Sequence, residues 1–434
     1  MTRSPLRSDA LAANSLLVSI TIFVFIFTIS PLFTHEINQV LKYVYTILLV
    51  ATTVWCLFTY FRFNPNPTFL MSPFLLSAIG AFTFLLVTAS TRNPITYASA
   101  LIPLLTAAVP VFLPERAVSI DVSRLMRWLY FVFLISGLVH TVATASDTGG
   151  GEFRASHEAS FTILFAAIIA GLQRNWRLFG LALALAIVSL IFRPSSTLAV
   201  SLGFASLYIW GHWIGWGRIA VAAAFWMTVV LVVMNSLIIY DVPVVDILFR
   251  FEPWLKEDVL GASSNNAFRI AVLEAAIDEF WQGSIFFGKL FSGDVNVYIR
   301  HLFPFYTDVV PVHNDFVNIG AQGGVIGAIL FATIFIGFGA TARKGLAISR
   351  AFGDPRLTAL FSSAVCANLV FVIYVAFNPV MQKIEYGIFY LIWIPLSVFA
   401  LRQLKSRVVR GRPMPTGQVG PGRLAPVASG QRHA

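Results

Sequence analysis

Apolar runs close to the length of a membrane span recur along most of this chain, separated by short polar connections. A helix needs about 20 consecutive apolar residues to cross the hydrocarbon core of a bilayer. The pattern therefore predicts an all-α polytopic integral membrane protein with about 12 transmembrane helices. We place these spans at residues 14–33, 41–61, 69–89, 95–113, 125–144, 159–173, 178–192, 196–214, 219–240, 316–339, 358–378 and 386–401.

Composition supports this fold class. Hydrophobic residues make up 57% of the chain and charged residues 12%, whereas a soluble domain carries about 25% charged residues. Both cysteines, Cys56 and Cys366, lie inside apolar runs. We expect them to be small core residues, because neither a disulfide framework nor a zinc site fits two isolated cysteines.

The distribution of charge orients the predicted spans. With the N-terminus in the cytoplasm, 20 of the 30 Lys and Arg residues fall on the cytoplasmic side, as the positive-inside rule requires. The net charge of +10 thus mostly reflects topology. The layout we expect is a cytoplasmic N-terminus at 1–13, spans 1–9 within 14–240, a large periplasmic loop at 241–314, spans 10–12 within 315–402, and a basic disordered cytoplasmic tail at 403–434. The tail can contact anionic membrane lipid, and we expect no nucleic-acid partner.

The loop at 241–314 is rich in aromatic and apolar residues, as in "DILFRFEPWL". Disorder requires low hydrophobicity, so we expect this loop to fold against the membrane surface. Within it, "SSNNAFRIAVLEAAIDEFWQGS" predicts a helix that begins near Ser264 and ends by Gly283. Arg269 falls in the first turn of that helix, where the helix dipole disfavours a cation.

The stretch "PVHNDFVNIGAQGGVIGAILF", residues 311–331, begins with a polar cluster and continues into four glycines. In a continuous helix from about residue 313, one face would carry His313, Gly320, Gly324 and Gly327. Glycines at this spacing let a second helix approach closely. The pattern therefore predicts that His313 lies at the membrane surface, above a tightly packed helix face.

Several signatures of other chemistries are missing from the sequence. "HEINQ" and "HEASF" lack the second histidine of a zinc-protease helix, and no phosphate-binding Walker motif occurs. No spacing typical of a metal site is evident, so we expect neither a metal nor another cofactor.

One combination of motifs resembles the O-antigen ligase and O-antigen polymerase superfamily. Its elements here are the pair His313-Asn314 at the end of a long outer loop and a Gly-x-x-Gly at Gly324 and Gly327. That family also carries an arginine at the head of a loop helix, a position that Arg269 takes in "NNAFRIAVLEAAIDEFWQGSIFFGKL". One place departs from the family pattern: "IFRPSSTLAV" has its arginine before two serines, where the family has a Ser-Arg or Ser-Lys pair.

The resemblance implies an enzyme of the bacterial inner membrane with both termini in the cytoplasm. Such an enzyme transfers a glycan from undecaprenyl diphosphate to an acceptor hydroxyl on the periplasmic side. The acceptor is another lipid-linked glycan in a polymerase and a lipid A core or similar molecule in a ligase, and both remain open. The catalytic residues that the resemblance implies are His313 and Arg269. We expect Asn314, Arg193 and Arg300 to be further substrate-binding residues.

The chemistry of these side chains suits that reaction. Arginine makes paired, charge-assisted hydrogen bonds to a diphosphate, and a neutral histidine can accept a proton from a hydroxyl at pH 7. The main alternative is a transporter or a flippase for lipid-linked glycans, which would place charged residues inside the spans. Another is a scaffold that presents the outer loop to partners. Nearly all charges here fall at span ends or in loops, which favours the enzyme over a transporter.

Overall fold

The structure, a computed structural model, describes four stretches of the chain: residues 122–146, 158–192, 196–216 and 314–377. It also describes a turn at 283–288 and a number of shorter pieces. These pieces are residues 40, 44, 47, 51, 219, 276–278, 281, 393–394, 396–398, 400–401 and 404.

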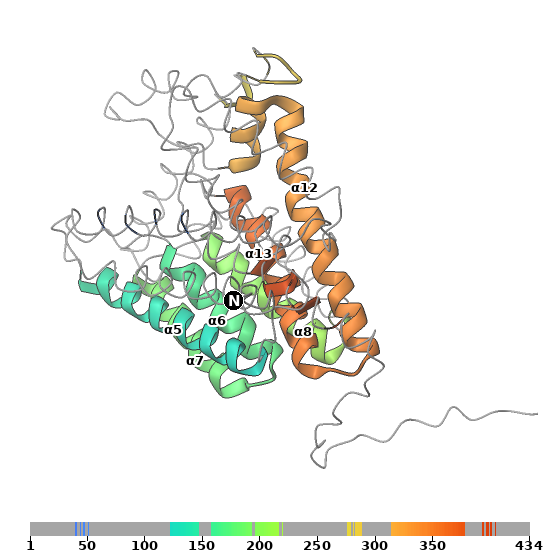
Figure 1. The fold of residues 1–434 in the computed structure, drawn as a ribbon. Helices are drawn as coiled ribbons and strands as arrows, with labels where there is room; N and C mark the ends of the chain where they lie inside the picture. The colour runs from blue at the N-terminus through green and yellow to red at the C-terminus, as the bar shows by residue number, and fades with distance from the viewer. Residues whose placement is uncertain are drawn as a thin grey trace, which may run out of the picture.

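The described part of the chain is all-helical apart from connections and the turn, as the sequence predicts (Figure 1). The six helices are α5 (Val122–Ser146), α6 (Glu158–Leu172), α7 (Trp176–Phe192), α8 (Ser196–Ile214), α12 (Asp315–Ala351) and α13 (Pro355–Phe377). Four of them, α5, α8, α12 and α13, are long and apolar enough to cross a membrane. The chain is thus a membrane protein, while the predicted spans 14–33, 41–61, 69–89, 95–113, 219–240 and 386–401 lie largely or wholly outside the described residues.

Helix α6 forms the centre of the bundle and packs against α5, α7, α8 and α13. Every residue from Phe161 to Leu172 is buried. It packs so tightly on α5 that a Cβ atom added to Gly137 would collide with Ile163. A helix enclosed by protein in this way needs no lipid-facing stripe, which explains an apolar run of uniform hydrophobicity in only 15 residues.

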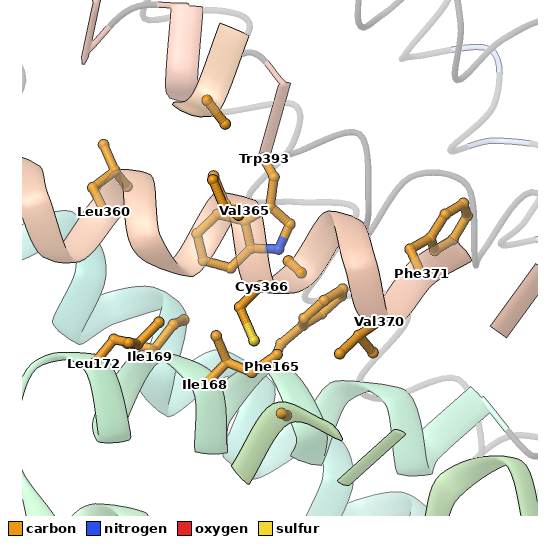
Figure 2. Packing of buried hydrophobic residues seen from close by; sticks show 14 of the residues in the cluster. Phe165, Ile168, Ile169, Leu172, Leu360, Val365, Cys366, Val370, Phe371 and Trp393 are labelled. Atoms are coloured by element: carbon orange, nitrogen blue, oxygen red, sulfur yellow. The ribbon is translucent and has the colours of Figure 1, made fainter. Parts of the chain in front are cut away.

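The interface between α6 and α13 is aromatic and closely packed. Phe161 lies with its ring centroid 4.5 Å from that of Tyr374 and 4.6 Å from that of Phe165. Figure 2 shows Cys366 between the two helices, with Trp393 from the C-terminal segment above it. The thiol of Cys366 is buried and forms no disulfide, as expected of a small core residue.

The turn between α12 and α13 is sharp and well capped. Gly353 has φ +65°, which glycine adopts without steric cost, and its N–H donates to the Arg350 carbonyl at 3.0 Å. The side chain of Asp354 then accepts hydrogen bonds from the backbone N–H groups of Arg356 and Leu357 at 3.0 and 3.1 Å. These contacts reverse the chain within a few residues and start α13 at Pro355, a favoured first helical residue.

Each Lys and Arg that the structure describes lies at the end of the bundle where α12 meets α13. Contacts between helix ends show this: Tyr130 near the start of α5 donates to Leu178, Arg174 covers the Trp213 ring at 5.3 Å, and Arg350 contacts His212 at 3.1 Å. The cations gathered there are Arg124, Arg127, Arg174, Arg177, Arg343, Lys344, Arg350 and Arg356. The positive-inside rule predicts that this end faces the cytoplasm.

That orientation predicts the outcome of thiol labelling on intact cells. A cysteine at Ile285, which is exposed in the turn, should react with an impermeant reagent added outside. A cysteine at Ala351, exposed beside the cations, should react only after the membrane is opened. Both variants should carry Cys56→Ala, whereas Cys366 is fully buried and can stay. Labelling at 351 but not at 285 would reverse the orientation.

Candidate functional site

The residues predicted for the site fall partly inside the described stretches. Asn314, Gly320, Gly324 and Gly327 belong to α12 and its N-terminal cap. The catalytic candidates His313 and Arg269 and the candidate ligands Arg193 and Arg300 lie outside the described residues. The structure therefore describes segments that are near these four residues in the sequence, but not the four residues themselves.

Helix α12 is bent at Gly324, which has φ 64° and ψ −165° inside an otherwise helical segment. In a straight helix Phe316 and Phe331 would be about 22 Å apart along the axis. Their ring centroids are 5.2 Å apart, and Phe316 also lies 6.1 Å from Phe335. Residues 315–323 thus form a half-helix that folds back along the following part of α12, as Figure 1 shows below the bend.

The half-helix begins at a polar cap. Asn314 has extended backbone angles (φ −158°, ψ 106°), and its side-chain oxygen accepts a hydrogen bond from the Val317 N–H at 3.1 Å. Asp315 follows and is fully buried, in the first turn, where the helix dipole stabilises a carboxylate. Local sequence therefore starts a helix directly after His313, as predicted.

The bend changes where this polar start lies. We expected a continuous helix from about residue 313 with a glycine stripe on one face. Instead Gly324 is the tip, and the polar start is packed back beside Phe331 and Phe335. The physical reason is the positive φ of Gly324, which a helix cannot continue through.

The depth of this polar start follows from helix geometry. Residues 325–342 separate the bend from the first cations of α12, Arg343 and Lys344, and span about 27 Å at 1.5 Å per residue. That is close to the hydrocarbon thickness of about 30 Å. If the cations lie at one membrane surface, this length would put the bend near the other. The half-helix would then return about 14 Å inward, which predicts that Asn314 and Asp315 lie within the membrane depth.

A turn from the loop covers the bend. The N–H groups of Val325 and Ile326 donate to the carbonyls of Ile285 and Phe286 at 2.9 and 3.2 Å. The first N–H groups of a helix have no partner within it, and a membrane provides none. The turn Gly283–Gly288 thereby caps the second part of α12.

Two glycines permit this contact, because the backbone of the turn lies directly against the backbone of α12 and leaves no room for side chains. A Cβ atom on Gly288 would be 2.6 Å from both the Ala321 carbonyl oxygen and the Gly324 nitrogen. A Cβ atom on Gly324 would collide with the Phe286 carbonyl group. The close approach predicted from the glycine spacing is thus made at Gly324, but by a turn rather than by a membrane helix.

The other two glycines of the predicted stripe behave differently. A Cβ atom on Gly320 would meet no described atom within 4 Å outside its own helix turn, and one on Gly327 would lie 3.4 Å from the Ile319 carbonyl oxygen of the folded-back half. Neither contacts a second membrane helix among the described residues. Gly288 was missed as a partner, although the Gly-Gly pair at 323–324 is a recognised turn signal.

The turn follows the end of the predicted loop helix. Ala276, Ile277, Asp278 and Trp281 are helical, whereas Gly283 is not. Ala276 is fully buried, while Ile277 is 40% exposed, so Ala276 faces the protein and Ile277 lies at the edge of the contact. Exposed apolar side chains occur in the turn, at Ile285, Phe286 and Phe287, and just before it, at Trp281.

A second polar cluster lies at the opposite, cation-rich end. The Nδ1 atom of His212 is 3.1 Å from an Arg350 nitrogen and 3.2 Å from the Ser362 hydroxyl oxygen. Arginine can only donate, so Nδ1 is the acceptor and the ring proton of neutral His212 is on Nε2. This cluster joins α8, α12 and α13 but lies far from the bend.

Comparison with known proteins adds no family assignment. The chain matches no protein-family model, and it has no significant match among curated proteins. The class that the structure defines is therefore an all-helical membrane protein with a bent helix, capped by a turn of the preceding loop, at one end of its bundle.

Proposed function

We propose that this chain is a membrane glycosyltransferase that moves a glycan from undecaprenyl diphosphate to an acceptor hydroxyl at the periplasmic face of the bacterial inner membrane. One observation carries the proposal. The two segments of the superfamily resemblance, the loop helix with its Gly-containing turn and the glycine-rich start of α12, contact each other through the turn Gly283–Gly288 and the bend at Gly324. Segments that must act on the same substrate are expected to be neighbours.

In the proposed reaction, His313 accepts the proton of the acceptor hydroxyl as its oxygen attacks C1 of the donor sugar. The new C1–O bond forms while the bond from C1 to the diphosphate oxygen breaks. Undecaprenyl diphosphate leaves with the electron pair of that bond, and Arg269 stabilises the developing charge. Asn314, Arg193 and Arg300 would contribute further polar contacts to the two substrates.

The setting suits a lipid-linked donor. The exposed apolar side chains of the turn lie at the end of the bundle away from every described cation, next to the bend that we place at the membrane surface. A polyprenyl chain can lie against such a surface, while its diphosphate stays at the interface. Polymerase and ligase activities remain equal candidates, because both use the same motif.

A transporter or flippase is the second candidate, and one observation favours it. Broken membrane helices are a feature of many transporters, and carboxylates within spans mark ion or proton paths. Asp315 is fully buried at the start of the half-helix. A transport path, however, needs several ionisable groups within the spans. Asp315 is the one buried charged residue in the part of the chain that the structure describes.

Carbohydrate gels of a deletion strain should separate these activities. If the chain is a polymerase, long glycans disappear and single repeats stay attached to the acceptor. Loss of a ligase strands long glycans on the carrier lipid. Loss of a flippase leaves lipid-linked repeats inside the cell, with no glycan at the surface. A normal glycan pattern in the deletion strain would contradict the proposal as a whole.

A further inference from the structure

The contact between the turn Gly283–Gly288 and the bend of α12, which we call the clasp, has a consequence for the proposed transfer. We infer that the clasp holds the loop helix and the half-helix in one fixed arrangement, and that Gly288 and Gly324 are positioning residues for the reaction. The inference deepens the proposed function and rests on it.

The clasp leaves little freedom for either partner to shift. Two hydrogen bonds join the carbonyls of Ile285 and Phe286 to the N–H groups of Val325 and Ile326. The turn is itself closed by a 2.6 Å bond from the Gly288 N–H to the Ser284 carbonyl. Opening the clasp would leave the first N–H groups of the second part of α12 without these carbonyl acceptors, and their own helix offers no replacement.

Glycine is needed at both positions for two reasons: the backbone angle φ is positive, and there is no room for a Cβ atom. Gly288 has φ +58° and Gly324 has φ +64°, values that other residues seldom adopt. The atoms that a Cβ would strike are backbone atoms of the opposite segment, which cannot rotate away as a side chain can. An alanine at either position must therefore push the two segments apart.

Each segment leads from the clasp to one of the two proposed catalytic residues. The turn follows the predicted helix that has Arg269 near its start, and the half-helix runs from the bend back to Asn314, next to His313 in the chain. Separating the segments would move both ends of the site relative to each other. Displacements of about 1 Å can cost about 100-fold in rate when groups must align.

The clasp can be tested first without any activity measurement. Ile285→Cys and Val325→Cys place two thiols on residues whose backbones share a 2.9 Å hydrogen bond, within reach of disulfide geometry. The protein should carry Cys56→Ala and a protease site inserted between residues 289 and 312. After oxidation in native membranes, the two protease fragments should remain joined until reduction. Fragments that separate without reduction would overturn the clasp.

The positioning role is tested by Gly288→Ala and Gly324→Ala in membrane vesicles supplied with lipid-linked donor. We expect kcat to fall about tenfold or more, with little change in the donor KM, because binding surfaces persist while the reacting groups are misaligned. In the Gly288→Ala protein the disulfide should form less readily. Wild-type kcat in Gly288→Ala, or an equal fall caused entirely by loss of protein, would overturn the role.

Gly353→Ala provides the matched control. Gly353 has φ +65°, like Gly324, but a Cβ atom there would meet no described atom within 4 Å. It should therefore keep wild-type kcat despite the same backbone strain. The outcomes also separate the two proposals: if the deletion strain keeps a normal glycan pattern while the disulfide forms, the proposed function fails and the clasp remains.

Discussion

Replacing His313 with alanine is expected to lower glycan transfer by about 100-fold to 10,000-fold, the range typical of removing a general base. Protein abundance in the membrane should stay at the wild-type level. The half-helix starts from the Asn314 cap and the Gly324 bend, so its formation does not need the imidazole. The measurement is complementation of the deletion strain, scored by carbohydrate gel and by quantitative immunoblot.

His301→Ala provides a matched control in the same loop, since no role is proposed for that side chain. It should complement fully. If His313→Ala also restores complete glycan assembly at normal abundance, the histidine has no catalytic role, and its place before the helix cap is structural.

Periodicity and run length predicted the described helices well. The predicted span at 125–144 corresponds to α5 (Val122–Ser146), and that at 196–214 to α8 (Ser196–Ile214). Long apolar runs leave few alternatives in a membrane, because a backbone in hydrocarbon must satisfy its hydrogen bonds internally. The short runs at 159–173 and 178–192 are also helices, of 15 and 17 residues.

The bend in α12 could not be predicted from run length and periodicity. Hydropathy shows that residues 315–342 are largely apolar, but it does not show whether the chain continues straight or reverses direction. The Gly323-Gly324 pair is compatible both with a tight turn and with close packing of straight helices. The deciding contact comes from Gly288, far away in sequence, and contacts of this kind leave no periodic signal.

The sequence therefore identified candidate residues for the site, but it did not predict how the segments that carry them are arranged. The sequence pattern singled out the segment after His313 and the Gly-containing end of the loop helix as two separate features. Their contact through Ile285 and Val325 is information that only the three-dimensional arrangement contains. The expectation of a continuous helix from residue 313 was wrong, because the bend at Gly324 folds Phe316 back onto Phe331 and Phe335.

Removing the Arg269 side chain is expected to reduce transfer by about 100-fold to 1,000-fold, as for the loss of a donor that stabilises charge in a transition state. Arg269→Lys should be impaired as well, because lysine keeps the charge but loses the planar, two-pronged geometry that matches a diphosphate. The measurement is the rate of transfer in vesicles with saturating donor, normalised to protein abundance.

Arg250→Ala, in the same loop and without a proposed role, tests whether any loss of positive charge slows the reaction. It should leave transfer unchanged at physiological salt. The double variant Arg269→Ala with His313→Ala should be little slower than His313→Ala alone, because groups that act in one transition state lose their effects non-additively. Wild-type transfer by Arg269→Ala would remove Arg269 from the site and leave the diphosphate to Arg193 or Arg300.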